Sequence, residues 1–404
     1  MTNLVITDVY CYLNKGDAGI VIAMVDQLKE KFDNPNIKIV SLYPSLDKEK
    51  YGSDVEIISP SVSVSESKSG LFKVVRNFLR FLCMLIRIMF HLYDPMLEAF
   101  SKADLIISCG GGYMQSFGVK HFLTDFIYHY SQLYAARLLG KRYVIFAQTV
   151  GPFDSRTKKR IRPIIENASL VLTREPISYK FVNDNFNCKK NILTSDVAFL
   201  LKPDNIDYQI DANKINVGVT IRDWGFPGKT NREYLRKKYI ESIISFINNT
   251  LKTNDNIIFY FMPQCIGPNT DNDLLIMDEI SSRLSDSRVH FVREDLTPGQ
   301  LKGLYGQMSF FIGMRMHSNI FALGVDVPCL AISYDRKTDG IMQLFNMANY
   351  VVSVEKIDEK TLSHVFKDLM NDFSIRKRIE KKRIEIESEA SKNFDLLVDL
   401  VGEK

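Results

Sequence analysis

The feature that most constrains the fold of this chain is a repeated alternation of short apolar strands with longer helices. Such alternation is typical of a parallel sheet that is covered by helices on both faces. In the first half, the pattern predicts strands at 4–7, 37–42, 104–108, 143–147, 170–172 and 191–194, and helices at 17–31, 122–139, 155–167 and 176–185.

The alternation stops in the polar stretch 202–213 and then begins again. The second half predicts strands at 215–221, 256–262, 289–291, 308–312 and 329–334, and helices at 234–251, 271–284, 298–306 and 318–323. The charged tail 359–401 has a helical period. Single cores rarely grow beyond about 250–300 residues, so 404 residues indicate more than one domain. We predict an N-terminal domain at 1–205, a second domain at 206–358, and C-terminal helices at 359–404 that pack back on the first domain.

Composition excludes several classes of protein. Apolar residues make up 46% and charged residues 25%, as in ordinary globular proteins. The net charge of +4 is too small to argue for nucleic acid, and we expect no nucleic-acid partner. The six cysteines are scattered without a C-x-x-C pair, as in a reducing compartment. The first eight residues predict a strand rather than a signal peptide, so we expect a cytoplasmic protein.

Two basic residues stand where a predicted strand gives way to a predicted helix. Arg315 and His317 follow the strand at 308–312 and precede the helix at 318–323. A helix N-terminus favours anions, so cations at this point indicate a bound anion. Arginine offers a planar fork to carboxylate or phosphate, and histidine exchanges a proton near neutral pH. In the alternative interpretation, Arg315 pairs with a neighbouring carboxylate and His317 only caps the helix.

Polar residues also end two other strands of the second half. Arg222 follows the strand at 215–221, and Gln264 follows the strand at 256–262. Because parallel strands end at one edge of a sheet, both side chains would reach the same ligand site. Asp271 begins the next predicted helix and is typical of an N-cap. A purely structural role is the alternative for each of these residues.

The first half carries candidates for binding a sugar. Asp17 precedes the first helix, where it either caps the helix or binds or deprotonates a hydroxyl group. Gly111 and Gly112 follow a strand and let a ligand approach the backbone, and Gln148 ends the next strand. The chain has no G-x-G-x-x-G spacing, no Gly-Lys-Ser/Thr phosphate loop and no metal-ligand spacing. We therefore expect no NAD, no metal and no other cofactor.

The segment 71–93 predicts an amphipathic helix whose only full charges are basic, namely Lys73, Arg76, Arg80 and Arg87. At about 100° per residue, these four lie within an arc of about 60°. Four charges disfavour a membrane span, whereas a basic amphipathic helix lying in a membrane surface fits the pattern. The alternative is a helix packed on the sheet with its basic stripe in water.

Together these motifs resemble the polysaccharide pyruvyl transferase family. The matching segments follow the family's order between about residues 8 and 345. They are 14–17, 110–112, 148–152, 173–175, 196–199, 262–264, 313–317, 332–335 and Lys337. Two positions depart from the family pattern: Ala18 stands where an acidic residue usually follows Asp17, and Val197 replaces the proline of a D-P-A-F motif.

The resemblance implies a GT-B-like α/β fold, in which two Rossmann-type doubly wound domains face a cleft, with the C-terminal helical tail added. It also implies an enzyme that moves the pyruvyl group of phosphoenolpyruvate onto two hydroxyls of one sugar. The products would be a cyclic ketal and phosphate. The family's Arg-x-His motif matches Arg315 and His317 and implies roles in donor binding and catalysis.

These observations predict two groups of site residues. The predicted donor-binding residues are Arg222, Gln264, Arg315, His317 and Ser318, and the predicted acceptor-binding residues are Asp17, Gly111, Gly112 and Gln148. His317 would protonate the donor, Arg315 would orient it, and Asp17 would deprotonate a sugar hydroxyl. The expected acceptor is a hexose such as galactose in a lipid-linked precursor of a capsule or exopolysaccharide. The enzyme would work at the inner face of the cytoplasmic membrane.

Two other functions remain open at this point. A GT-B glycosyltransferase that uses a nucleotide sugar would have the same fold and would also hold a diphosphate at a helix N-terminus. A non-catalytic sugar-binding or regulatory protein could also have kept the fold.

Overall fold

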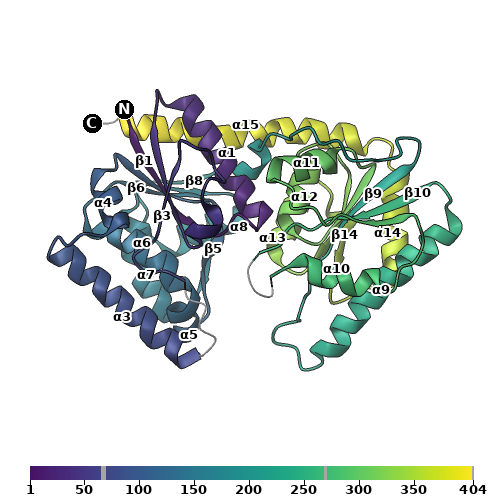
Figure 1. The fold of residues 1–404 in the computed structure, drawn as a ribbon, viewed down its shortest axis with the longest axis horizontal. Coiled ribbons are helices and arrows are strands. Elements are labelled where there is room, and N and C mark those ends of the chain that lie inside the picture. Colours follow the sequence, from purple (N-terminus) through teal and green to yellow (C-terminus); the bar gives the residue numbers. More distant parts are fainter. Residues whose placement is uncertain (65–69, 268–270, 403–404) are drawn as a thin grey trace. The chain divides into compact units, whose positions relative to one another are not determined.

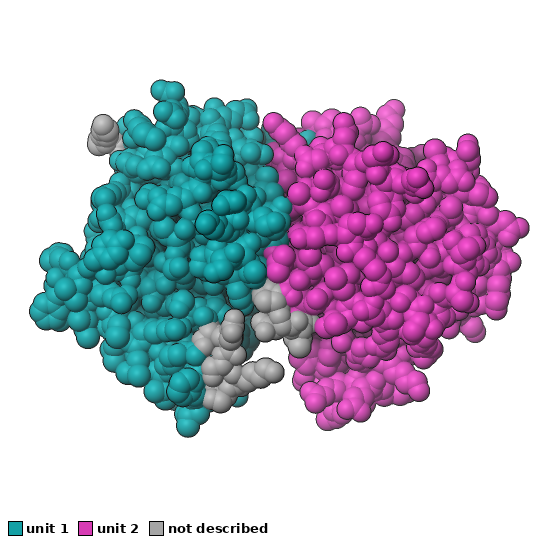
Figure 2. All heavy atoms as spheres, in the orientation of Figure 1, with its two compact units in different colours: residues 1–12, 20–197, 387–404 teal, residues 13–19, 198–386 magenta. Residues whose placement is uncertain are grey.

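The chain folds into two compact units, and the computed structural model describes residues 1–64, 70–267 and 271–402. Unit 1 comprises Met1–Tyr12, Ile20–Val197 and Glu387–Lys404, and unit 2 comprises Leu13–Gly19 and Ala198–Ile386 (Figure 2). Helices α1 (Lys15–Lys31) and α15 (Ile375–Gly402) each contribute residues to both units. The predicted domain boundaries after residues 205 and 358 stay a prediction.

Unit 1 is built on a parallel sheet with the strand order β3-β2-β1-β4-β6-β7-β8, and β5 pairs with the second half of β6 (Figure 1). The chain extends the sheet from β1 in one direction and then resumes with β4 on the other side of β1. The switch point of the topology, where open α/β sheets bind ligands, therefore lies between β1 and β4. The strands are β1 (Asn3–Val9), β2 (Asn36–Ser41), β3 (Glu56–Ile58), β4 (Leu105–Ser108), β5 (Gly111–Ser116), β6 (Tyr143–Phe153), β7 (Leu170–Thr173) and β8 (Asn191–Leu193).

Capping side chains mark where several helices of unit 1 begin. Asp94 accepts bonds from the backbone amides of Met96 and Leu97 at the start of α4, and Asp154 does the same at the start of α7. A π-helical turn, Phe122–Phe126, joins α5 to α6, and a 3₁₀ turn, Val197–Leu200, follows β8. Besides α1 and the end of α15, the helices are α2 (Pro44–Asp47), α3 (Gly70–Met89), α4 (Pro95–Lys102), α5 (Val119–His121), α6 (Ile127–Leu138), α7 (Ser155–Asn167) and α8 (Pro176–Asn185).

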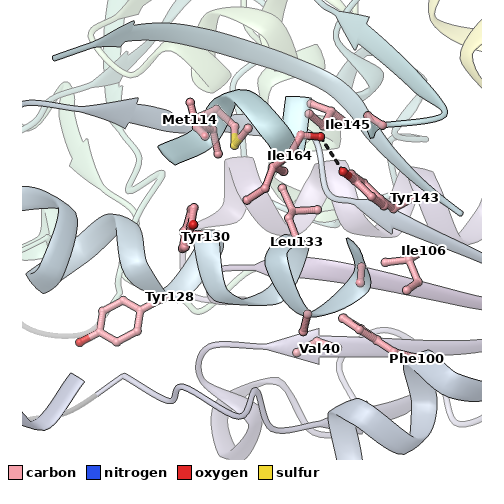
Figure 3. Packing of buried hydrophobic residues seen from close by; sticks show 14 of the residues in the cluster. Val40, Phe100, Ile106, Met114, Tyr128, Tyr130, Leu133, Tyr143, Ile145 and Ile164 are labelled. Carbon is pink, nitrogen blue, oxygen red and sulfur yellow. Dashed lines mark hydrogen bonds between the residues drawn. The ribbon is translucent and has the colours of Figure 1, made fainter. Parts of the chain in front are cut away.

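The core of unit 1 lies between its sheet and the helices α4, α6 and α7 (Figure 3). Ile106 and Ile145 from the sheet and Leu133 from α6 are fully buried. The hydroxyl of Tyr143 donates a hydrogen bond of 2.6 Å to the carbonyl of Ile164, so its polar end is satisfied inside the core. Helix α6 is thus fixed against the sheet and gives its side chains defined positions.

Unit 2 contains a second parallel sheet, with the order β11-β10-β9-β12-β13-β14. Its switch point lies between β9 and β12, because β10 and β11 extend the sheet on one side and β13 and β14 on the other. The strands are β9 (Ile215–Thr220), β10 (Ile257–Phe261), β11 (Val289–Phe291), β12 (Phe310–Gly313), β13 (Cys329–Ser333) and β14 (Val351–Ser353).

The helices of unit 2 follow its strands in the same alternation. At the start of α11, Thr297 and Gln300 form a reciprocal capping box, with Pro298 in the first turn. Besides the beginning of α15 and a 3₁₀ turn at Ala348–Tyr350, the helices are α9 (Arg232–Thr253), α10 (Asp273–Ser281), α11 (Pro298–Gly306), α12 (Met316–Leu323), α13 (Arg336–Leu344) and α14 (Glu359–Asn371).

The two Rossmann-like sheets and the C-terminal helix confirm the predicted fold class. Every strand and helix that the pattern predicted has a counterpart, although the ends of several differ. The predicted helix at 122–139 begins with the π-helical turn, and the predicted tail divides into α14 and α15. Asp372 separates the two tail helices by accepting bonds from the backbone amide and hydroxyl of Ser374.

Helix α3 is shorter than the predicted segment 71–93, because it ends at Met89. Its basic side chains contact unit 1: Lys73 pairs with Asp125, Arg80 donates to the carbonyl of Ser63, and Arg87 pairs with Asp94. These cations are thus bound to the protein and not simply solvated, although Arg87 keeps 43% of its side chain exposed. The membrane-surface interpretation stays a prediction. No helix among the described residues is both long enough and apolar enough to cross a membrane.

Candidate active site

Three central strands of unit 2 end in the residues that the sequence assigned to the donor. Arg222 lies two residues after β9, Gln264 follows β10, and Arg315 follows β12. Strand β9 pairs with both β10 and β12 in parallel register, so the three carboxyl ends are neighbours. These residues therefore lie around the switch point of this sheet, where a ligand is expected.

Arg315 is the most buried charge of this group and is held by two carboxylates. Its Nε and Nη2 donate to Oδ1 of Asp273 at 3.1 and 2.6 Å, and Nη2 donates to Oδ1 of Asp271 at 2.8 Å. Arg315 thus pairs with neighbouring carboxylates, as in the structural alternative considered for it. Three hydrogen bonds thus orient its guanidinium, which follows the carboxyl end of β12.

The two carboxylates differ in how firmly they are fixed. Asp273 is almost fully buried, and its Oδ2 also accepts bonds from the backbone amides of Gln264 and Cys265. Burial raises the pKa of Asp273, and the charge of Arg315 opposes this rise. Burial would also raise the pKa of Asp271, but the charge and hydrogen bond of Arg315, together with the charge of Arg222, outweigh it and hold that pKa below its ordinary value. Asp271 keeps 29% of its side chain exposed, so it is the more exchangeable partner of Arg315.

Arg222 reaches the same carboxylate from the neighbouring strand. Its Nη2 lies 3.3 Å from Oδ1 of Asp271, and its Nη1 donates to the Tyr334 hydroxyl at 3.1 Å. The guanidinium also lies over the rings of Trp224 and Tyr334, at 5.7 and 5.3 Å from their centroids. These contacts orient Arg222 while leaving 29% of its side chain exposed.

A pocket of about 290 Å³ in unit 2 opens beside these charges. Its charged lining is balanced, with three arginines facing three aspartates. An anion would enter favourably only by taking the place of a carboxylate on one of the arginines. The lining residues are Arg222, Asp223, Gly225, Arg236, Asp271, Asn272, Asp273 and Arg315.

His317 lies against the start of helix α1, within the segment Leu13–Gly19. That segment belongs to unit 2 through its contacts, since the Lys15 amide donates to the carbonyl of Gln264 at 3.0 Å. A Cβ added to Gly16 would lie 2.4 Å from Nδ1 of His317. Gly16 therefore lacks a side chain where the imidazole packs on the backbone, and the two motifs form one site.

Asn14, and not Asp17, caps helix α1. The side-chain oxygen of Asn14 accepts bonds from the amides of Gly16 and Asp17 at 3.2 and 3.4 Å. Oδ2 of Asp17 accepts a bond of 2.8 Å from Nδ2 of Asn14. Asp17 is therefore not the cap, and the structure places it with the predicted donor residues in unit 2.

Two other predicted donor residues are buried. The Ser318 hydroxyl pairs with that of Thr220 at 2.6 Å and contacts the Arg315 carbonyl at 2.7 Å. Oε1 of Gln264 accepts from the Tyr305 hydroxyl at 2.7 Å. Nε2 of Gln264 is also buried, without a partner among the described residues. The contacts of Ser318 hold the Arg315 backbone, and donor binding by either residue stays a prediction.

The remaining predicted acceptor residues lie in unit 1. Gly111 pairs with Gln148 in the register of β5 with β6, and Gly112 is the next residue of β5. Nε2 of Gln148 donates to the carbonyl of Cys109, directly after β4. The structure thus brings Gly111, Gly112 and Gln148 together near the switch point of unit 1.

A polar cluster that was not predicted from the sequence lies beside these residues. Nδ1 of His129 on α6 lies 3.2 Å from Oδ1 of Asp8 near the end of β1, and the ring of Tyr113 stacks on His129 at 4.0 Å. The Tyr113 hydroxyl contacts that of Ser108 at 2.5 Å. Burial raises the pKa of Asp8, and the contact with His129 opposes the rise. The polar end of a predicted strand could have revealed Asp8, but nothing in the helical pattern of α6 singles out His129.

Within the residues that the structure describes, no group of three His, Cys, Asp or Glu side chains is arranged to hold an ion. What the unit 2 site offers is a pair of oriented guanidinium groups, an imidazole and exchangeable carboxylates. This set suits binding of a small dianion and proton transfer to it.

Comparison with known sequences decides the family. The pattern of the polysaccharide pyruvyl transferase family matches residues 14–336, which include both the segment around Asp17 and Arg315 with His317. The chain belongs to the polysaccharide pyruvyl transferase family. It is therefore a transferase with a role in polysaccharide biosynthesis. A relative, the amylovoran biosynthesis protein AmsJ of Erwinia amylovora, is 21% identical over 402 residues, which cover 92% of this chain and 94% of AmsJ.

Solved structures share the fold of this transferase at low identity. The S. aureus MnaA structure with UDP has a TM-score of 0.61 and 11% identity, and the alignment covers 100% of this chain and 99% of that chain. The spinosyn forosaminyltransferase SpnP has a TM-score of 0.54 and 12% identity, with all of both chains covered. At these identities the likeness supports the fold alone.

Proposed function

We propose that this enzyme transfers the pyruvyl group of phosphoenolpyruvate onto two hydroxyls of one sugar and releases phosphate. One observation carries the proposal: two guanidinium groups share a single, partly exposed carboxylate at the pocket where the Arg-x-His motif lies. Phosphoenolpyruvate carries a carboxylate and a phosphate, and each matches a guanidinium fork.

The donor would bind by displacing the carboxylate of Asp271 from Arg222 and Arg315. Asp271 stands where an anionic group of the ligand can contact both Arg222 and Arg315. Asp273 stays in place, because Arg315 and two backbone amides hold it. Arg315 thus remains paired and oriented, while its second partner changes from Asp271 to the donor. The pocket lining carries three arginines and three aspartates, so its formal charges cancel. Displacement of Asp271 would free positive charge for a dianion.

In the proposed first step, protonated His317 gives its proton to C3 of the donor. The electron pair of the C2–C3 double bond forms the new C–H bond, and C2 becomes an oxocarbenium-like centre. A sugar hydroxyl attacks C2 and loses its proton to Asp17, which the structure places in the same unit. Arg222 and Arg315 stabilise the charge on the phosphate and carboxylate as it changes.

In the second step, the second hydroxyl of the same sugar attacks C2. The C2–O bond to phosphate breaks, and its electron pair leaves with phosphate. The proton of this hydroxyl returns to His317, and the proton on Asp17 passes to the departing phosphate. One donor and one diol thus give one cyclic ketal and one phosphate, with both acid–base groups restored.

The acceptor would be a hexose such as galactose in a lipid-linked precursor of a surface polysaccharide. The family and the printed role of AmsJ in amylovoran biosynthesis support a polysaccharide precursor. Gly111, Gly112 and Gln148 are the candidates in unit 1 for contacting this sugar.

A thermal-shift experiment tests the donor. We expect phosphoenolpyruvate to raise the unfolding midpoint of the full chain, because it binds only the folded state. Inorganic phosphate and UDP-galactose serve as comparison ligands. The shift should disappear in Arg222→Gln, whose substitution leaves the buried Arg315–Asp273 pair intact. A shift with UDP-galactose and none with phosphoenolpyruvate would replace the proposal with a nucleotide-sugar glycosyltransferase.

A further inference from the structure

Helix α3 presents an apolar face to the outside of unit 1. Apart from Arg87, which pairs with Asp94 and keeps 43% of its side chain exposed, the exposed side chains of this helix are apolar or cysteine. The exposed fraction of the apolar ones runs from 38% for Leu82 to 79% for Leu71. At about 100° per residue, these side chains cover an arc of about 140°. The exposed apolar residues are Leu71, Phe72, Val75, Phe78, Leu79, Leu82, Ile86 and Met89.

The charges of α3 lie on the opposite side of the helix. Lys73 and Arg87 are bound to Asp125 and Asp94, and Arg80 donates to a backbone carbonyl of unit 1. Asn77 and Met84, which share this inner face, are fully buried. The fourth cation, Arg76, has its Nε and Nη2 atoms buried and lies 5.7 Å from the ring centroid of Phe72. The centre of the apolar face therefore carries no charge that would be costly to bring into an apolar phase.

The apolar surface continues beyond the helix. Phe90, Leu92 and Tyr93 are each more than half exposed in the segment that leads to α4. Tyrosine is suited to the boundary between an apolar layer and water, because its ring is apolar and its hydroxyl is polar. Soluble proteins rarely expose apolar patches of this extent without a partner.

The helical layer to which α3 belongs also exposes basic residues. Helix α7 exposes Arg156, Lys159, Arg160 and Arg162. A chain of contacts links it to α3: Phe81 of α3 packs on Tyr130 of α6, Tyr130 packs on Phe122, and Arg160 lies 5.3 Å from the Phe122 ring centroid. Figure 1 shows α3, α6 and α7 as neighbouring helices of one layer, with α3 outermost.

We propose that α3 and residues 90–93 dock this enzyme on the surface of an anionic lipid bilayer. The apolar face would lie among the acyl chains near the headgroups, and the exposed cations of α7 would contact anionic headgroups. A second copy of the chain fits less well, because pairing through α3 would bring two sets of α7 cations toward each other. The proposal rests on unit 1 alone and does not depend on the transferred group.

Vesicle co-sedimentation of the full chain tests this surface. We expect binding to vesicles of phosphatidylcholine with phosphatidylglycerol, and weaker binding to phosphatidylcholine alone or in high salt. The triple variant Leu79→Ser/Leu82→Ser/Ile86→Ser should lower the partition coefficient by roughly tenfold or more, because each change removes buried hydrocarbon. These side chains point outward, and far-UV circular dichroism with a melting curve verifies that the variant is folded.

A matched control changes exposed apolar residues elsewhere. Tyr234→Ser/Leu275→Ser/Ile384→Ser alters three side chains of unit 2 that are even more exposed than the three on α3, and it should bind vesicles like the wild type. Charge reversal by Arg156→Glu/Lys159→Glu should weaken binding to anionic vesicles only.

Two results would overturn the proposal. The first is a wild type that does not sediment with anionic vesicles, or a triple variant that sediments as the wild type does. The second is a lipid-free dimer, measured by light scattering, that becomes a monomer in the triple variant. That second result would assign α3 to a contact between copies. Neither outcome depends on phosphoenolpyruvate, so a failure here is distinct from a failure of the proposed reaction.

Discussion

The two units place different chemistry at equivalent points of similar sheets. At the switch point of unit 1, Asp8 is fully enclosed and contacts His129, while Tyr113 covers the imidazole. At the switch point of unit 2, Arg222 and Asp271 remain partly exposed beside a pocket. The first arrangement is a polar cluster closed by its own helix, and the second is a set of ion pairs open to exchange.

This difference shows how one topology can serve two tasks. A switch point leaves space at the carboxyl edge of the sheet, and the residues of the neighbouring helices determine which side chains occupy that space. In unit 1, Gln132 of α6 accepts a bond from the Asp8 amide, so α6 supplies partners to the strand ends. In unit 2, the partners of Arg315 come from the start of α10 and from the residue Asp271 just before it. Charged ligands are therefore expected in unit 2.

The largest expected effect comes from the imidazole of unit 2. His317→Gln should reduce the turnover of phosphoenolpyruvate with an acceptor by about 10²–10⁴-fold if His317 is the general acid. Phosphate release measures the rate, and an unchanged melting temperature shows that the fold is kept. Turnover close to that of the wild type would remove His317 from the proposed mechanism.

The two carboxylates on Arg315 should respond differently to neutralisation. Asp273→Asn leaves a buried guanidinium with one partner and should reduce the free energy of unfolding by about 3–5 kcal/mol. Asp271→Asn should change stability little and should raise the affinity for phosphoenolpyruvate, because the competing carboxylate is gone. Urea unfolding and a donor titration provide the two measurements. Equal losses of stability in both variants would contradict the exchange at Asp271.

Substituting alanine for Gly16 tests the contact between the start of helix α1 and His317 of the Arg-x-His motif. Gly16→Ala places a Cβ on the imidazole of His317 and should reduce turnover by roughly 10²-fold through misplacement of the ring. Gly340→Ala, in α13, meets no atom within 4 Å and is the matched control. If both variants turn over at the same rate, the position of His317 against residue 16 is not required for the reaction.

The smallest effect is expected in the closed cluster of unit 1. Because the folded-state pKa of Asp8 is raised above its ordinary value, the folded chain binds this proton more tightly than the unfolded chain. Its contribution to stability is thus present below about pH 4 and is lost as pH rises through the raised pKa. Urea unfolding between about pH 4 and 7 should show this decline in the wild type, and Asp8→Asn should lack that component. Identical profiles would mean that Asp8 does not titrate in this range.

Much of the fold could be predicted because strand and helix periods are local properties. Helices α7 and α8 have the predicted ends, since Asp154 and Glu175 cap them and both signals are visible in the sequence. Short elements such as β3 and β5 were missed, because three to six partly buried residues leave no clear period. The π-helical turn before α6 arises from packing that no local pattern records.

The site was partly visible for a related reason. Arg222, Gln264 and Arg315 end strands, and parallel strands carry their ends to one edge. The membership of Asp17 in unit 2 could not be seen, because it depends on hydrogen bonds between residues 15 and 264. The orientation of α3 could not be predicted either. The sequence shows a basic stripe, but the pairing of Lys73 with Asp125 and of Arg87 with Asp94 depends on the folded structure.

Unit 1 combines segments that are far apart in the sequence, and this has a consequence for when it can finish folding. Its sheet and its helices up to α8 leave the ribosome first, but its residues in α15 are synthesised only after residues 198–386 of unit 2. Phe394 packs on Phe146 of β6, with ring centroids 5.2 Å apart, and Asn393 donates to the carbonyl of Ser195. Until residues 387–402 are released, the nascent unit 1 exposes the apolar surface that these residues cover. Its completion therefore waits for the synthesis of unit 2, and fragments that end between the units would have to fold without these residues.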